Sequence, residues 1–355
     1  MSDPTQRPTI ADVAALSGVS RATVSKALNG KDRVDPETRA RVKAAADQLG
    51  YSPNVRAQRL RGGRSKTIAL LTALPASIVG EASQLGFLLD LALPVAQSCL
   101  EHGYSLLLVP PISSSSSLNM LDVDGAIVID PVTGDPYCAA LRRRGIPVVT
   151  VGRSPDTEVD GYVDRGDAGV GAVLAHLIDA GSTHVAILLS EEAFSISTAI
   201  AAHLDQRDND PENVRFSVVH APVGGGEAAG HAATIAALSA DPSIDAVYAP
   251  LDAFAIGALR AATELGRLIP DNLRVATNYD GRRAATAEPP LTALDLRLPD
   301  IARSAVDLLF GILDGGTQES VRAPEATVIP RKSTARAGAT EGHPSPAAVV
   351  PLETP

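Results

Sequence analysis

Cationic and hydroxyl side chains recur at helical spacing near the start of the chain. Arg21 and Lys26 supply positive charge, and Thr23 and Ser25 supply hydroxyl groups between them. Guanidinium and ammonium groups pair with phosphates and guanine edges, and hydroxyl groups donate to phosphate oxygens. Together on one helix they fit the major groove of duplex DNA. The alternative is a helical hairpin inside a larger core, which gives these groups no reason to share one face.

Two short helices around a tight turn would present these side chains. Thr9 and Ser20 are suitable N-caps for the two helices, and Gly18 between them tolerates the left-handed conformation that ends a helix. A third helix is predicted at 35–50, where Asp and Pro open it and Gly closes it. Residues 1–52 are therefore predicted to form an all-α helix-turn-helix domain.

The charge of the chain is divided between a basic start and an acidic remainder. The net charge is −10, yet residues 1–64 contain 12 Lys and Arg against 6 Asp and Glu, a balance of +6 that leaves −16 for the rest. This division confines phosphate binding to the first part of the chain.

Composition also bears on the compartment in which the protein works. The sequence has no apolar run of membrane-spanning length, and its first residues lack the apolar segment of a secretion signal. Cys99 and Cys138, the only cysteines, lie in apolar helical patterns and suit a reducing compartment. The predicted localisation is cytoplasmic and, through DNA, nucleoid-associated, with no membrane partner.

The stretch Ile10–Asn29 resembles the N-terminus of the LacI/GalR family of bacterial transcription regulators. The matching residues, at fixed spacing, are Ile10, Asp12, Val13, Ala14, Gly18, Val19, Ser20, Thr23, Val24, Ser25, Ala27, Leu28 and Asn29. The predicted DNA-binding residues are Thr9, Ser20, Arg21, Ala22, Thr23, Ser25, Lys26 and Asn29. We interpret Arg21, Ala22 and Lys26 as base-reading and the others as mainly phosphate-binding.

An arginine-rich segment at 53–64 follows the helical domain. It is compatible with a helix of about two turns, which is marginal alone in water, so we expect it to order on DNA. The resemblance implies that it is a hinge helix in which Leu60 wedges into the minor groove, with Asn54 and Ala57 also engaging that groove. The alternative is a plain flexible linker.

Residues 65–332 alternate between apolar strand patterns and helical patterns. This alternation predicts parallel sheets covered by helices on both faces, in two doubly wound lobes. The resemblance implies an α/β core like that of type I periplasmic binding proteins, and we place the crossovers between lobes near Gly161, Leu291 and 316–322. The helix expected between about 109 and 124 is predicted to be shortened or lost, because five serines fill the gap. Residues 333–355 are predicted to be a disordered tail.

Ligands of such sheets bind beyond the carboxyl ends of the strands. The predicted effector-binding residues there are Phe87, Asp130, Arg153, Ser190, Asp252 and Asp280. For Asp252 the alternative role of helix N-cap is weighted more heavily, whereas the resemblance implies that Asp280 accepts hydrogen bonds from an effector. Many relatives place an effector-binding Arg near Ala199, but no Arg occurs between Leu174 and Gln206. The bidentate clamp of the family is therefore missing from that helix.

The sequence predicts a DNA-binding transcriptional regulator, interpreted as a repressor. It should bind a pseudo-palindromic operator on double-stranded DNA as a homodimer, controlled by a small molecule such as a sugar. One alternative is a regulator with a vestigial cleft controlled by a protein partner or by abundance, and another is a solute-binding receptor. No enzyme, metal or cofactor signature is found: the seven His lack metal-ligand spacing, and no G-x-S-x-G motif occurs.

Overall fold

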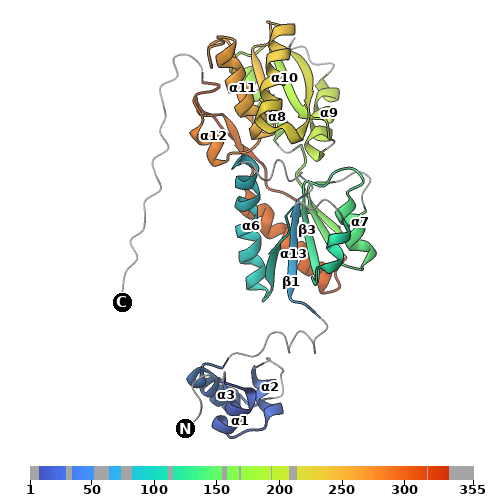
Figure 1. Cartoon of the computed structure of the whole chain (residues 1–355), viewed down its shortest axis with the longest axis vertical. Coiled ribbons are helices and arrows are strands. Elements are labelled where there is room, and N and C mark those ends of the chain that lie inside the picture. Colours follow the sequence, from blue (N-terminus) through green and yellow to red (C-terminus); the bar gives the residue numbers. More distant parts are fainter. Residues whose placement is uncertain are drawn as a thin grey trace, which may run out of the picture. The chain divides into compact units, whose positions relative to one another are not determined.

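The computed structural model describes residues 8–28, 34–51, 64–72, 82–110, 115–153, 158–167, 169–192, 194–207, 214–317 and 319–335. The chain divides into two compact units, Met1–Ser65 and Lys66–Pro355 (Figure 1). None of the described helices is both long enough and apolar enough to span a bilayer.

The first unit contains three helices, α1 (Ile10–Ser17), α2 (Arg21–Leu28) and α3 (Pro36–Leu49). Their shared core is small and aliphatic, and consists of Val13, Ala14, Val24, Ala27, Val42, Ala45 and Ala46. The predicted end signals are confirmed. Gly18 and Gly50 both adopt left-handed conformations, with φ values of 67° and 62°, and the Asp35 carboxylate accepts a hydrogen bond from the Thr38 amide at 3.0 Å.

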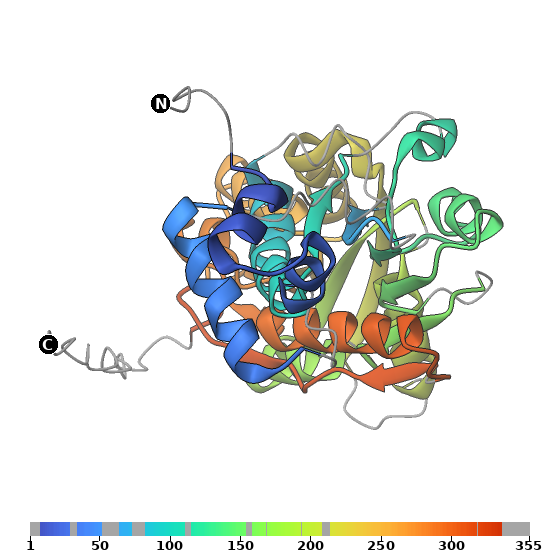
Figure 2. The same cartoon turned by 90° about the horizontal axis from the view of Figure 1, so that it is seen from below.

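The second unit begins with a lobe built on a six-stranded sheet in the order β11-β5-β4-β3-β1-β2. Its strands are β1 (Thr67–Thr72), β2 (Ser105–Leu108), β3 (Gly125–Ile129), β4 (Val148–Val151), β5 (Gly161–Asp164) and β11 (Ser320–Arg322), and every pairing is parallel. Helices α6 (Ala82–Glu101) and α13 (Leu298–Leu313) pack on one face, while α7 (Pro136–Arg143) and the 3-10 helix η1 (Ser115–Met120) pack on the other. Figure 2 shows α13 in orange with β11 in red beside it.

The helix between β2 and β3 is reduced, as predicted, to the six residues of η1. Its Leu118 is fully buried among residues of the second face, and the Arg144 guanidinium donates to the carbonyl of Leu121 just beyond it. A short 3-10 turn with one apolar anchor therefore covers the surface on which a longer helix was expected.

The second lobe has a four-stranded parallel sheet in the order β7-β6-β8-β9. Its strands are β6 (His184–Ser190), β7 (Arg215–Ala221), β8 (Ala246–Ala249) and β9 (Arg274–Thr277), and its helices are α8 (Val170–Asp179), α9 (Ser195–Arg207), α10 (Gly226–Ala240), α11 (Asp252–Glu264) and α12 (Arg282–Thr286). The 3-10 turn η2 (Val223–Gly225) precedes α10, and β10 (Ala293–Asp295) pairs antiparallel with β12 (Thr327–Ile329). The two doubly wound lobes are therefore confirmed.

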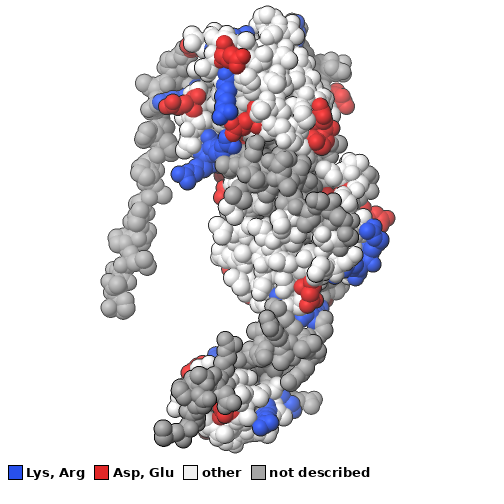
Figure 3. Space-filling model, in the orientation of Figure 1, with Lys and Arg blue, Asp and Glu red and all other residues white. Residues whose placement is uncertain are grey.

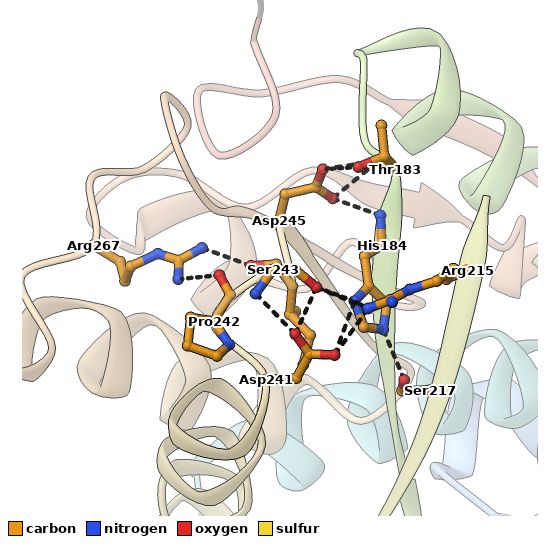
Figure 4. Close-up of polar contacts among 10 residues, drawn as sticks. Thr183, His184, Arg215, Ser217, Asp241, Pro242, Ser243, Asp245 and Arg267 are labelled. Atoms are coloured by element: carbon orange, nitrogen blue, oxygen red, sulfur yellow. Dashed lines mark hydrogen bonds and ion pairs between the residues drawn. The ribbon is translucent and has the colours of Figure 1, made fainter. Parts of the chain in front are cut away.

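A buried polar network holds the amino ends of the second lobe's strands together (Figure 4). The Nε2 atom of His184 lies 2.8 Å from the Ser217 hydroxyl, and its Nδ1 atom lies 2.6 Å from Arg215 Nη2. Because Arg215 can only donate, Nδ1 must accept, which places the ring hydrogen on Nε2. The Asp245 carboxylate accepts from the amide groups of Thr183 and His184 at 2.8 and 3.0 Å. This network lies at the strand ends opposite the ligand side, so its role is structural.

The three crossovers each lie a few residues later in the chain than predicted. Strand β5 still pairs within the first lobe, so the first crossover follows it at 165–169 rather than at Gly161. The second follows β10, and the third follows β11. The physical reason is the same in each case, because a short strand completes its hydrogen bonds within one lobe before the chain leaves it.

The predicted start of the disordered tail is wrong by at least two residues. Ser333 and Thr334 are 0% and 1% exposed. The Ser333 hydroxyl accepts from the Thr292 amide at 2.8 Å and donates to the Val275 carbonyl at 2.6 Å, and the Thr334 hydroxyl lies 2.7 Å from His176 Nε2. Composition marked these residues as tail, but their hydroxyl groups pair with groups of the second lobe.

Candidate nucleic-acid interface and ligand site

Helix α2 presents a small, polar and cationic surface. Val24 and Ala27 are buried in the core of the first unit, whereas Arg21, Ala22 and Lys26 are exposed. The base-reading residues predicted from the sequence therefore share the solvent face of one helix. Figure 3 shows Lys and Arg side chains on this unit. The arrangement offers guanidinium and ammonium donors beside a methyl group, the set suited to a major groove.

The hydroxyl groups predicted to bind phosphate also organise the helix ends. The Ser20 hydroxyl accepts from the Thr23 amide at 3.1 Å and lies 2.9 Å from the Thr23 hydroxyl. The Thr9 amide and hydroxyl both donate to the Asp12 carboxylate at 2.7 Å. These hydrogen bonds hold the pKa of Asp12 below its ordinary value of 3.8, so a negative charge stays at the positive end of α1. Thr23 and Ser25 are half-buried on α2.

Several predicted DNA-binding residues lie outside the described residues. These are Asn29 after α2, and Asn54, Ala57 and Leu60 in the proposed hinge. Their minor-groove and phosphate roles remain predictions.

An inner cavity of about 580 Å³, its open mouth included, lies between the lobes of the second unit. It is lined by Phe87, Asp130, Arg165, Phe194, Ile196, Pro250, Leu251, Asp252, Asn278, Tyr279 and Leu296. The strand ends of both sheets supply its polar groups: β3 ends just before Asp130, and β9 ends just before Asn278. Aromatic rings, carboxylates and an amide therefore surround one space, as expected for the ligand position of such sheets.

Tyr279 connects the second lobe to the first across this cavity. Its hydroxyl donates to the Asp90 carboxylate at 2.5 Å, and its ring meets the Phe87 ring edge to face at 5.1 Å. Burial and the hydrogen bond to Asp90 raise the pKa of Tyr279 above its ordinary value of 10.0, so the hydroxyl stays protonated and keeps donating. Because Asp90 and Phe87 belong to α6, the lobes are held closed at this side.

Arg165 makes a second connection, from the first crossover. Its Nη2 atom pairs with the carboxylate of Asp130, in the first lobe, and donates to the Ser195 hydroxyl of α9, in the second lobe, at 3.3 Å. Gly152 leaves room for the three groups, since a Cβ on it would lie 3.0 Å from Ser195 Oγ and 3.4 Å from Arg165 Nη2. Asp130 is held with φ at 47°, an uncommon conformation for a residue other than glycine. A guanidinium thus joins the lobes where the family clamp is missing.

An outer cavity of about 980 Å³, open solvent included, adjoins the inner one. Arg165 and Ile196 line both cavities, and Arg153, Asp164, Ser195 and Thr198 help to line the outer one. Arg153 is exposed and lies 5.8 Å from the centre of the Tyr162 ring. Polar groups from α9 and from the strand ends of the first lobe therefore face one space.

The structure brings together four of the six effector-binding residues predicted from the sequence. Phe87, Asp130 and Asp252 line the inner cavity, and Arg153 lines the outer one. Asp252 is not the N-cap of α11, because Leu251 occupies that position and Asp252 is the first helical residue, 3% exposed. Its preferred role as a capping residue is therefore wrong.

The other two predicted residues serve the fold. The Ser190 hydroxyl donates to the Glu192 carbonyl at 2.6 Å, and the Asp280 carboxylate forms an ion pair with Arg331 at 2.6 Å. Neither residue lines the inner or the outer cavity. Both follow strands, but their side chains turn back onto neighbouring segments.

Sequence reasoning missed Arg165, Asn278, Tyr279 and Phe194. The signal for Asn278 and Tyr279 was present, because they are the first two residues after β9 and precede Asp280. Arg165 and Phe194 carried no comparable signal, since each belongs to a connection whose direction depends on how the lobes meet. An isolated antiparallel bridge between Val132 and Phe194, which joins the lobes, shows this dependence.

Comparison with known proteins agrees with the two-unit arrangement. The family model described as bacterial regulatory proteins of the lacI family matches residues 9–54, and the model of a periplasmic binding protein-like domain matches residues 174–334. The transcriptional regulator CelR of Thermobifida fusca is 31% identical over 340 residues, covering 89% of this chain and 95% of that protein. The regulator MalR of Streptomyces coelicolor is 31% identical over 357 residues, covering 94% and 99%.

Solved structures show the same fold. A complex of the transcriptional regulator CelR with cellobiose superposes with a TM-score of 0.66 at 28% identity, covering 92% of this chain and all of that one. The lac repressor dimer bound to operator superposes with a TM-score of 0.72 at 21% identity, covering 93% and 99%.

The helix-turn-helix unit and the two-lobed core with its cleft define a DNA-binding transcriptional regulator. The chain belongs to the LacI family of bacterial regulatory proteins.

Proposed function

We propose that this regulator is a repressor that binds a pseudo-palindromic operator as a homodimer, and that a polyhydroxylated small molecule between its lobes sets its affinity for DNA. The observation that carries the proposal is the inner cavity. Asp252 and Asn278 offer hydrogen-bond acceptors and an amide donor, and the rings of Phe87 and Tyr279 offer apolar faces, which together suit a sugar ring. A relative, CelR, has been solved with cellobiose, which makes cellobiose the first compound to test.

An exposed apolar face on the first lobe supports the homodimer. Leu89, Leu93 and Leu100 lie on one side of α6 at helical spacing, and the latter two are 70% and 68% exposed. Leu107 and Leu108, in the edge strand β2, are also exposed. The surface over α6 carries few charged side chains (Figure 3). A second copy related by a twofold axis would cover this face and place two α2 helices on one duplex, which a specific site requires.

Coupling between ligand and DNA would run through closure of the lobes. The contacts of Tyr279 and of Arg165 span the two lobes beside the cavity, so a ligand that favours one closure angle changes the position of the first lobe relative to the second. In a dimer this movement changes the spacing of the paired DNA-binding units. The proposal therefore identifies a two-state element that both ligand and DNA bias.

Footprinting on the DNA upstream of the protein's own gene tests the function. We expect protection of two half-sites whose centres are about one helical turn, roughly 10 base pairs, or a multiple of it apart. A ligand such as cellobiose should change the affinity by about five- to 150-fold. Protection without any response to a panel of sugars would instead favour control by a protein partner or by abundance, and absence of site-selective protection would refute the proposal.

The dimer has its own test by sedimentation of the purified chain. Leu93→Glu and Leu100→Glu place charges on the exposed face of α6 and should convert dimer to monomer. The matched control is Leu16→Glu, since Leu16 is also an exposed leucine, 48% accessible, but belongs to the first unit. Dimers that survive both α6 substitutions would contradict this interface.

A further inference from the structure

We propose that the effector carries an anionic group, a phosphate or a carboxylate, which binds in the outer cavity between Arg153 and Arg165. This inference rests on the proposed function, because it names the class of effector that the same cleft accepts. Its starting point is the guanidinium of Arg165, which the family's sequence pattern does not supply from this position.

Arg165 is a buried cation with unmatched hydrogen-bond donors. Its side chain is only 10% exposed, and its Nη2 atom is engaged by Asp130 and Ser195. The Nε atom is buried and has no acceptor among the described residues. Leaving a charged donor without an acceptor is costly, so an oxygen-bearing ligand beside this guanidinium would complete its hydrogen bonds.

The outer cavity adds further groups that favour negative charge. Arg153 lies in its wall and forms no ion pair with any described residue. Helix α9 begins at Ser195, and the hydroxyls of Ser195 and Thr198 in its first turn face the same cavity. A helix amino end carries partial positive charge, and guanidinium groups match phosphate and carboxylate oxygens in pairs. These groups converge on one space from two lobes.

The opposing charge in the outer cavity is smaller. Asp164 also lines it, but its carboxylate accepts from the Gly166 amide at 2.9 Å and is turned toward its own loop. Two guanidinium groups thus face one occupied carboxylate. The inner cavity, by contrast, holds Asp130 and Asp252 and suits the hydroxyl-bearing part of a ligand. The predicted effector is therefore a hydroxylated ring with an acidic substituent, such as a sugar phosphate or a sugar acid.

Calorimetry and thermal unfolding of the full chain test the site. The probes are inorganic phosphate, glucose 6-phosphate and glucuronate, each compared with glucose at equal ionic strength set with chloride. We expect the anions to bind and to raise the unfolding temperature of the second unit, and Arg153→Gln to weaken binding about tenfold or more. A preference for glucose 6-phosphate or for glucuronate distinguishes a phosphate from a carboxylate group.

Matched variants separate this site from other cationic surfaces. Arg143→Gln removes an exposed arginine of α7 and should leave anion binding unchanged. The double variant Arg21→Gln with Lys26→Gln should also leave it unchanged, which excludes the DNA-binding unit as the anion site. Because Arg153 is exposed, its replacement should leave the fold intact, whereas Arg165→Gln additionally removes the partner of Asp130.

The outcomes distinguish this inference from the proposed function. Anion binding that is equally strong in the Arg153→Gln variant, or no binding beyond the chloride control, overturns the anionic site. If a neutral sugar then binds and changes DNA affinity, the proposed function stands. If no compound binds and DNA affinity never changes, both are wrong.

Discussion

Replacing Ser333 with alanine tests how the carboxyl-terminal edge of the second lobe is held. The hydroxyl accepts from the Thr292 amide at 2.8 Å and donates to the Val275 carbonyl at 2.6 Å, in a position that is 0% exposed. The Val275 amide also donates to the Ser333 carbonyl at 3.1 Å. Because Val275 lies in β9, whose end leads to Asn278 and Tyr279, this anchor supports the floor of the inner cavity.

The magnitude follows from the two hydrogen bonds that the substitution removes. One buried N–H donor and one buried carbonyl acceptor are deprived of the hydroxyl, and each unsatisfied group costs about 1–3 kcal/mol. Ser333→Ala should therefore reduce the free energy of unfolding of the second unit by about 2–4 kcal/mol. For a unit of this size the unfolding temperature should fall by roughly 5–12 °C.

The assay is urea and thermal unfolding followed by far-ultraviolet circular dichroism. Ser239→Ala is the matched control, because Ser239 is exposed on α10. A chain ending at Lys332 should be destabilised at least as much as Ser333→Ala, whereas a chain ending at Ala335 keeps all of these hydrogen bonds and should be unaffected. Unfolding of Ser333→Ala that matches Ser239→Ala within about 0.5 kcal/mol would refute the reasoning.

Three further substitutions test packing, protonation and DNA binding. Gly257→Ala should destabilise by about 1–3 kcal/mol or more in urea unfolding, because a Cβ there lies 2.4 Å from a backbone oxygen of α10, whereas Gly311→Ala meets nothing within 4 Å and should be neutral or stabilising. Burial lowers the pKa of His176 below 6.5, so the unfolded chain takes up the proton first; the free energy of unfolding should decline as pH falls below about 6.5, and His176→Gln should remove that contribution to the slope in urea titrations across this range. Replacing Arg21 and Lys26 together with Gln should weaken operator binding and flatten the dependence of log K on log salt by about 0.9 for each phosphate that is no longer neutralised; an unchanged slope in anisotropy titrations would contradict their role.

Local signals in the sequence were sufficient for the elements themselves. Caps and stops such as Gly18, Asp35 and Gly50 act within one turn of chain, and the apolar periodicity of strands such as 124–129 reflects burial on two faces. The uneven distribution of charge likewise follows from composition alone. These features predicted the two-unit order, the parallel lobes and the cationic surface of α2, because each depends on residues close together in the chain.

Only the tertiary structure decided which side chains share the cleft. Asp130 and Asp252 were found because they follow strands, but Arg165 reaches Asp130 and Ser195 only after the chain has crossed between lobes. Tyr279 reaches Asp90 across 189 positions of sequence, and Ser333 is buried only because β9 and Thr292 accept it. Spacing along the chain carries no information about such pairs, since their distance is fixed by how the two lobes pack. Thus the sequence determined the parts, and the closure of the lobes determined the site.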